Sequence, residues 1–220
     1  MINTVIFDLD GTLLNSLDDI CDSINETLIN YGYPTRTIEE VESFVGNGAL
    51  TLIKKSLPNT VNDTNSIENF LKSYLLNYKK NLHNKTKPYD GIDDLLINLS
   101  NRGYKLAVVS NKSDDGVKSL CEDYFSPFIK TAIGESIHTP KKPAKEGVLQ
   151  ALKEVDSTLE EAIYVGDSEV DVLTASNANL PCVGVTWGFR SKEVLIEHGA
   201  TYIIDKPNEL ITILENINEV

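Results

Sequence analysis

The residues best suited to chemistry are two aspartates close to the amino terminus. Asp8 and Asp10 follow the apolar run Val5–Phe7 and precede Gly11 and Thr12. Because side chains alternate along an extended chain, the two carboxylates leave the same face of a strand. Neighbouring carboxylates repel each other and need a proton or a cation close by. A strand that ends in this way is therefore a candidate site for a divalent metal and a phosphate group.

Two later apolar runs also end in polar side chains. Ser110 and Asn111 end the first, and Asp167 follows the second, with Asp171 about one helical turn further on. In open α/β sheets, ligands bind at the carboxyl ends of the strands. We therefore expect these side chains to meet Asp8 at one edge of a sheet.

A pair of lysines lies between those two runs. Either Lys141 or Lys142 would bring an ammonium group to the same edge, and Pro143 directly follows Lys142. Taken alone, the serine, the lysines and the later aspartates each have an ordinary explanation as turn formers, surface groups or helix caps. Their order along the chain and their places after predicted strands favour a functional explanation.

Composition narrows the class of partner. The chain has 220 residues and a formal net charge of −13 at pH 7, which argues against nucleic acid or an anionic membrane as a partner. Cys21, Cys121 and Cys182 are widely spaced and odd in number, so they indicate neither a disulfide framework nor a zinc site. We see no basic leader and no apolar run near the roughly 20 residues of a membrane span, and expect a cytoplasmic protein.

The alternation of apolar runs and helical patterns predicts the fold class. Over most of the chain, short runs that are apolar on both faces alternate with helices, which favours a parallel sheet covered on both sides. One block near the amino terminus has helical spacing only. We predict an α/β, Rossmann-like core from residues 1–14 and 85–220, with an inserted α-helical domain from residues 15–84.

With these motifs in view, the chain resembles the haloacid dehalogenase superfamily, in its phosphatase branch. Asp8–Thr12 matches the first family motif and Ser110–Asn111 the second. Lys142–Pro143 matches the third, and Gly166–Asp171 matches the fourth. The third motif often continues to a second proline, which is Lys145 here, so Lys141 stays an alternative to its neighbour.

The resemblance implies a role for each matched residue. Asp8 would attack phosphorus and form an aspartyl-phosphate. Asp10 would protonate the leaving oxygen and later accept a proton from water. Ser110 would bind a phosphoryl oxygen, and Lys142 would neutralise charge on the nucleophile and the phosphate.

The resemblance also implies a Mg²⁺ cofactor. The ion would be held by Asp8, the backbone carbonyl of Asp10 and Asp167, a set of oxygen ligands that suits Mg²⁺. Asp171 completes the expected metal site, chiefly by orienting these ligands.

The helical insertion resembles the small cap of this superfamily, which closes over substrate and selects the leaving group. Gly46, Asn47 and Gly48 resemble the cap loop of phosphoglycolate phosphatases and are expected substrate contacts, as are Thr12 and Asn111. A helix-breaking turn that never meets ligand is the alternative explanation for the cap loop.

The expected activity is hydrolysis of small phosphomonoesters similar to 2-phosphoglycolate. A pyrophosphatase and a phosphosugar mutase of the β-phosphoglucomutase type would share these motifs and stay open. A non-catalytic phospho-ligand-binding protein on the same fold is disfavoured, because Asp8 and Asp10 are both present. The partner is a small phosphate ester, and the chain is a monomer or a homodimer. Trp187–Arg190 either lines the pocket or only packs.

Overall fold

The computed structural model describes residues 1–219, and the chain divides into two compact units. The first contains Met1–Leu14 and the chain from Pro88 onward, and the second is Asn15–Lys87. Two short strands, β2 (Leu14–Asn15) and β3 (Lys87–Pro88), pair with each other where the chain passes between the units.

A parallel sheet forms the centre of the first unit. Its strands are β1 (Thr4–Phe7), β4 (Lys105–Ser113), β5 (Thr131–Glu135), β6 (Ala162–Gly166), β7 (Cys182–Val185) and β8 (Tyr202–Ile204). They lie in the order β5-β4-β1-β6-β7-β8, and every adjacent pair is parallel. Phe7 of β1 pairs with Val108 of β4 on one side and with Val165 of β6 on the other. The carboxyl ends of these strands therefore meet at one edge, and the predicted α/β fold class is confirmed.

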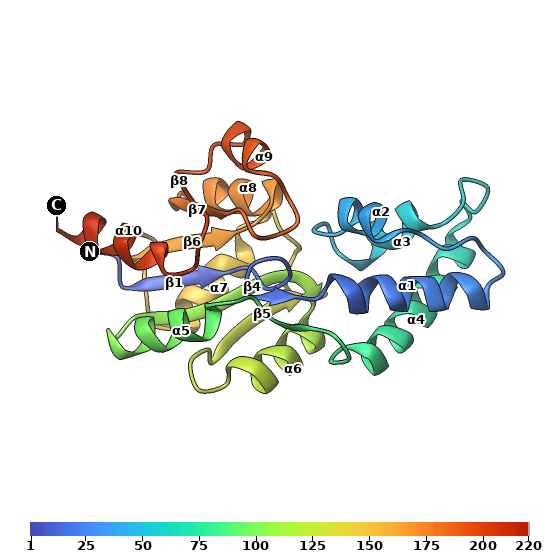
Figure 1. Cartoon of the computed structure of the whole chain (residues 1–220), viewed down its shortest axis with the longest axis horizontal. Coiled ribbons are helices and arrows are strands. Elements are labelled where there is room, and N and C mark those ends of the chain that lie inside the picture. Colours follow the sequence, from blue (N-terminus) through green and yellow to red (C-terminus); the bar gives the residue numbers. More distant parts are fainter. Residues whose placement is uncertain (220) are drawn as a thin grey trace. The chain divides into compact units, whose positions relative to one another are not determined.

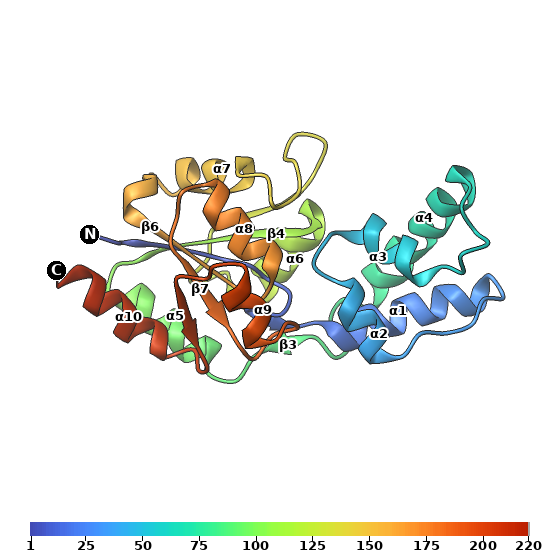
Figure 2. The same ribbon diagram turned by 90° about the horizontal axis from the view of Figure 1, so that it is seen from above.

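Helices cover both faces of this sheet (Figure 1). They are α5 (Ile92–Asn101), α6 (Asp114–Phe125), α7 (Glu146–Glu154), α8 (Glu169–Asn177), α9 (Lys192–Glu197) and α10 (Glu209–Asn218), with a 3-10 turn at Leu159–Glu161. Figure 2 shows α7 and α8 on one side of the sheet and α5 and α10 on the other. Because both faces are covered, all residues of β1 are buried, Thr4 as well as the apolar run Val5–Phe7.

One hydrophobic cluster joins the sheet to α7 and α8, the helices on one of its faces. Strand residues Ile6, Val109 and Tyr164 belong to it together with Val148 of α7 and Val172 of α8. Burial of this apolar surface contributes about 25 cal/mol per Å² and fixes the strands against the helices. Since α8 begins directly after β6, its first turn is held at the edge where the strands end.

The second unit is helical: α1 (Leu17–Asn30), α2 (Ile38–Phe44), α3 (Ala49–Ser56) and α4 (Thr64–Asn81). A capping box between Thr37 and Glu40 begins α2 and satisfies backbone N–H groups there. The ring of Phe70 in α4 lies 5.1 Å from that of Tyr31, which follows α1. Contacts of this kind pack α1 against α4.

A buried carboxylate ties the two ends of this unit together. Asp19, in the first turn of α1, is 0% exposed. It accepts hydrogen bonds from the backbone N–H groups of Lys85 and Thr86 and from the Thr86 hydroxyl.

The cysteines Cys21, Cys121 and Cys182 are buried, and none of them forms a disulfide. Within residues 1–219, no helix combines the length and the apolar character that crossing a bilayer requires.

Candidate active site

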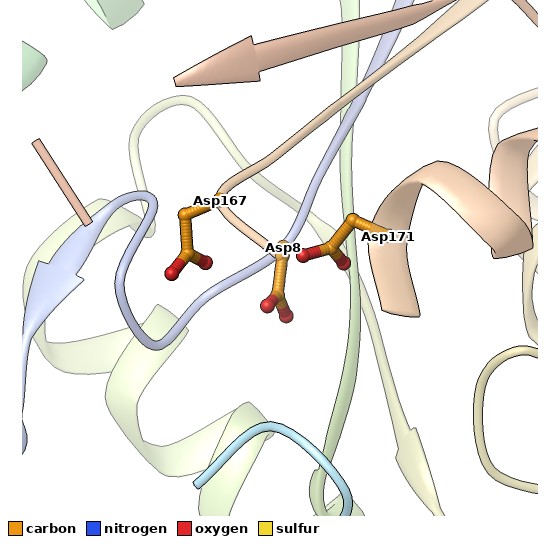
Figure 3. Close-up of side chains that lie close together, drawn as sticks. All are labelled: Asp8, Asp167 and Asp171. Atoms are coloured by element: carbon orange, nitrogen blue, oxygen red, sulfur yellow. The ribbon is translucent and has the colours of Figure 1, made fainter. Parts of the chain in front are cut away.

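Three carboxylates meet at the carboxyl edge of the sheet. Asp8 directly follows β1, Asp167 directly follows β6, and Asp171 projects from the first turn of α8 (Figure 3). Each offers one oxygen, and these oxygens lie within 4.8 Å of one another. All three side chains are buried. The adjacency of β1 and β6 produces this cluster, because parallel neighbours end side by side.

Lys142 supplies the positive charge of this cluster. Its Nζ lies 2.8 Å from Asp8 Oδ1 and 2.7 Å from Asp171 Oδ1, and its side chain is 3% exposed. The ammonium also donates to the Tyr164 hydroxyl at 3.2 Å. Lys141 is exposed, so the structure places Lys142 and not its neighbour among the carboxylates.

The charges of the cluster do not balance. Burial, opposed by Lys142 and aided by Asp171, raises the pKa of Asp8 to about 7. Burial also raises the pKa of Asp167 well above its usual range, with Asp171 and Asp8 acting in the same direction. Burial alone would lower the pKa of Lys142, but the carboxylates of Asp171 and Asp8 hold it well above its ordinary value. A further cation beside Asp8 and Asp167 would relieve this excess of negative charge.

The carboxylate of Asp10 binds a second lysine. Lys112, near the end of β4, places its Nζ 2.8 Å from each carboxylate oxygen of Asp10. β4 continues past Ser110 to Ser113, because Ser113 pairs with Glu135 of β5. The predicted strand ends earlier, at Ser110, and so leaves Lys112 outside the sheet.

Asn111 binds the backbone of Lys142, the lysine that lies among the carboxylates. Its Nδ2 donates to the Lys142 carbonyl at 3.1 Å, and its Oδ1 accepts from the Lys142 N–H at 2.6 Å. These bonds engage both ends of the side-chain amide that was expected to contact substrate. Ser110, one residue earlier in β4, is buried at the same strand end.

Hydrogen bonds fix the two carboxylates that come from β6 and α8. Asp171 Oδ2 accepts from the Ser168 N–H at 3.0 Å, as part of the capping box that begins α8, and also from the Ser168 hydroxyl at 2.6 Å. Thr12 Oγ1 donates to Asp167 Oδ1 at 3.1 Å. With one oxygen facing Lys142 and the other facing Ser168, Asp171 is suited to orienting its neighbours.

The cap-loop residues lie in the other unit. Gly46, Asn47 and Gly48 connect α2 to α3, and Gly48 is the N-cap of α3. Gly46 has a φ of 105° and Gly48 a φ of 80°, a backbone conformation that favours glycine. The sharp turn of this loop follows from these two residues.

Comparison with known families identifies the chain. The family model described as haloacid dehalogenase-like hydrolase matches residues 5–185, a span that includes Asp8, Lys142 and Asp167. The chain belongs to the haloacid dehalogenase-like hydrolases. The resemblance to this superfamily predicted from the sequence motifs is confirmed.

Relatives of this haloacid dehalogenase-like hydrolase match nearly all of its length. It is 29% identical to phosphoglycolate phosphatase 1 of Pseudomonas aeruginosa, over 98% of this chain and 81% of the relative. It is 29% identical to phosphoglycolate phosphatase of Colwellia psychrerythraea, over 96% of each chain. A crystal structure described as a predicted phosphatase from Clostridium acetobutylicum superposes with a TM-score of 0.86 at 30% identity, covering 98% of this chain and 99% of the other. The predicted likeness to phosphoglycolate phosphatases is thus confirmed.

The residues of this hydrolase fit the divalent metal that the family resemblance implies. Asp8 Oδ1 is buried and pairs with Lys142 Nζ at 2.8 Å, and a carboxylate oxygen with one such partner still has a second lone pair. Such an atom has a lone pair to offer, and the carboxylate of Asp167 lies close by. Oxygen ligands from few carboxylates suit Mg²⁺, which keeps several waters and accepts phosphate oxygens.

Sequence reasoning missed two side chains of the site. Lys112 follows Ser110 and Asn111 directly, and its place after a predicted strand was a usable signal. Tyr164 lies inside an apolar strand, yet its hydroxyl donates to the Val109 carbonyl and contacts Lys142. A tyrosine in an otherwise apolar strand usually needs such a polar partner, which was the signal here.

The segment 187–190, for which the sequence left pocket lining and packing as alternatives, contacts the site. Trp187 Nε1 donates to the Thr12 carbonyl at 3.0 Å. The Phe189 N–H donates to Asp167 Oδ2 at 2.8 Å. Arg190 forms an ion pair with Glu169 at 3.1 Å.

Proposed function

We propose that this hydrolase is a Mg²⁺-dependent phosphatase of small phosphomonoesters, with 2-phosphoglycolate as the model substrate and Asp8 as the nucleophile. The observation that carries the proposal is the position of Asp8. It follows β1, contacts Lys142, and shares a buried cluster with Asp167 and Asp171. The relatives named phosphoglycolate phosphatase support the choice of substrate class.

In the first step, an oxygen of Asp8 attacks phosphorus. The new bond joins that oxygen to phosphorus, and the bond between phosphorus and the leaving oxygen breaks. Asp10 gives its proton to the leaving oxygen, so the product alcohol departs neutral. Lys142 offsets the negative charge on Asp8 and on the phosphoryl group, and Ser110 donates a hydrogen bond to a phosphoryl oxygen.

In the second step, water cleaves the aspartyl-phosphate. Asp10, now ionised, accepts a proton from the water as its oxygen attacks phosphorus. The bond between phosphorus and Asp8 breaks, which releases inorganic phosphate and restores the carboxylate. Asp10 ends the cycle protonated, as it began.

Asp8, Asp167 and the backbone carbonyl of Asp10 would hold the metal. The bound Mg²⁺ supplies positive charge that lowers the repulsion between the anionic nucleophile and the anionic phosphate. Asp171 keeps these groups in place through its bonds to Ser168 and Lys142.

We assign substrate choice to the helical unit and its loop Gly46–Gly48. Thr12 is a further proposed substrate contact at the first unit's site. Truncation of Asn47 to alanine should raise KM for 2-phosphoglycolate while kcat changes less, because the residue would bind substrate and take no part in proton transfer.

The deciding experiment compares wild type with Asp8→Asn. Purified protein with Mg²⁺ is tested on 2-phosphoglycolate, pyrophosphate and glucose 1-phosphate, and phosphate release and sugar products are both measured. We expect the highest kcat/KM for 2-phosphoglycolate, no turnover by Asp8→Asn, and loss of activity with EDTA that Mg²⁺ restores. A folded Asp8→Asn variant with full turnover would refute the nucleophile. Preference for pyrophosphate, or formation of glucose 6-phosphate, would refute the substrate class or the hydrolytic outcome.

A further inference from the structure

The residues Trp187, Gly188 and Phe189, here called the 187–189 segment, lie close to β7 in the chain and meet the loop after β1. The backbone N–H of Phe189 donates to Asp167 Oδ2 at 2.8 Å. The indole N–H of Trp187 donates to the carbonyl of Thr12 at 3.0 Å. The hydroxyl of the same Thr12 donates to Asp167 Oδ1 at 3.1 Å. Both oxygens of Asp167 are thus held by hydrogen bonds that lead to this segment.

The packing at Gly188 is equally tight. A Cβ at this position would lie 2.3 Å from Asp167 Cβ and 2.3 Å from the Gly11 carbonyl oxygen. A Cβ at Gly11, whose φ is +87°, would lie 2.4 Å from Asp167 Oδ2. The carboxylate of Asp167 therefore fits between two backbones that approach this closely only because both residues lack a side chain.

A role in packing alone does not explain these contacts. The residues of the segment are all partly exposed, whereas Asp167 is 1% exposed. The segment contacts this buried acid through a backbone N–H and a side-chain-free residue, and supports Thr12 through an indole N–H. None of these contacts is the burial of an apolar side chain.

We infer that Trp187 and Gly188 are positioning residues that set the orientation of the Asp167 carboxylate for a divalent metal. The inference rests on the proposed function, because it assumes that Asp167 is a metal ligand. Groups that orient a ligand typically change metal affinity by about 10–100-fold when they are altered. The segment acts on the metal through Asp167 and touches no reacting atom.

The test measures Mg²⁺ dissociation constants by calorimetry on the full chain, with circular dichroism to confirm that each variant is folded at the temperature used. Gly188→Ala forces Asp167 aside and should weaken Mg²⁺ binding by about 10–100-fold. Trp187→Phe keeps an aromatic ring but removes the indole N–H, and should weaken binding by about tenfold. Thr186→Val is the matched control. Thr186 directly precedes the 187–189 segment, and its hydroxyl donates to Asp205 and not to Asp167.

Each outcome decides the inference. The inference is supported if Gly188→Ala and Trp187→Phe bind Mg²⁺ more weakly while Thr186→Val binds it as wild type does. If Gly188→Ala does not fold, the result for Trp187→Phe decides. Wild-type affinity in folded Trp187→Phe overturns it, and so does equal weakening by Thr186→Val. If wild type turns over 2-phosphoglycolate and Asp8→Asn does not, this failure leaves the proposed function intact. A wild type that binds no Mg²⁺ overturns the inference and the metal-dependent function together.

Discussion

Lys112 and Asp10 form a two-point contact in which Nζ lies 2.8 Å from each oxygen of the carboxylate. The side chains are 7% and 18% exposed, so the pair is largely shielded from water. The contact joins the end of β4 to the loop after β1. Two contacts to one ammonium restrict the rotation of the carboxylate, and Asp10 is the residue to which we assign both proton transfers.

Substitution of Lys112 by methionine should therefore lower kcat by about 10–100-fold with little change in KM, because a freely rotating Asp10 spends less time in the productive geometry. Steady-state kinetics on 2-phosphoglycolate measure the effect. Lys112→Arg retains a cation able to bind both oxygens and should recover part of the loss. A folded Lys112→Met variant with wild-type kcat would show that the contact does not serve catalysis.

Magnesium affinity should depend on pH through Asp8, whose pKa is raised to about 7 by burial. A carboxyl with a raised pKa favours folding while protonated. That contribution is complete below the ordinary aspartate pKa of 3.8 and is lost as the pH rises through about 7. Mg²⁺ needs the ionised carboxylate, so its apparent affinity should increase between about pH 6 and pH 8, by up to about tenfold per unit for each proton released.

Calorimetry in buffers of different ionisation enthalpy measures both the affinity and the proton release. The increase in Tm caused by Mg²⁺ should grow over the same range. Affinity that stays constant from about pH 6 to pH 8, without proton release, would show that the metal does not bind to Asp8.

The sequence predicted the elements of the site because its signals are local. Apolar runs define the strands on their own, and the residue that follows each run is placed at the sheet edge by the parallel arrangement. This is why Asp8, Asp167 and the region of Ser110 were found. The order of the strands, which places β1 between β4 and β6, turns those separate signals into one cluster.

The partners of these residues are less predictable, because they depend on side-chain directions across the sheet. The spacing of the residues does not predict that Asn111 binds the backbone of Lys142 or that Lys112 binds Asp10. The end of β4 shows the same limit. Its last residues are polar and therefore do not resemble a strand in the sequence. The continuation to Ser113 depends on pairing with Glu135 of a different strand.

Replacement of Lys142 by methionine should destabilise the protein near neutral pH. The change leaves the buried carboxylates of Asp8 and Asp171 without their cation, and loss of one partner from a buried ion pair costs about 3–5 kcal/mol. Urea unfolding measures the loss. The exposed neighbour gives the control, since Lys141→Met should change the free energy of unfolding by less than about 0.5 kcal/mol. Equal effects of the two substitutions would contradict the assignment of Lys142 to the site.

Asp19 should stabilise the helical unit in a comparable way through hydrogen bonds. Its Oδ2 lies 2.8 Å from the Thr86 backbone nitrogen and 2.7 Å from the Thr86 hydroxyl. Asp19→Ala removes the charged acceptor that Asp19 provides to these donors and to the Lys85 N–H. A hydrogen bond to a charged group contributes about 1.5–3 kcal/mol, so we expect a total loss of about 3 kcal/mol. Hydrogen exchange should accelerate at the amides of Lys85 and Thr86.

Two matched variants distinguish the effect of the Asp19 carboxylate on stability from the effects of its neighbours. Thr86→Val removes only the hydroxyl and should cost about 1 kcal/mol, while Asp18→Ala changes an exposed acid in the same helical turn and should cost less than about 0.5 kcal/mol. Because Asp19 bonds to the segment that leads out of the unit, its loss should loosen that segment before the helices unfold. Unchanged exchange at Lys85 and Thr86 in Asp19→Ala would show that other contacts, and not this carboxylate, hold the exit of the chain.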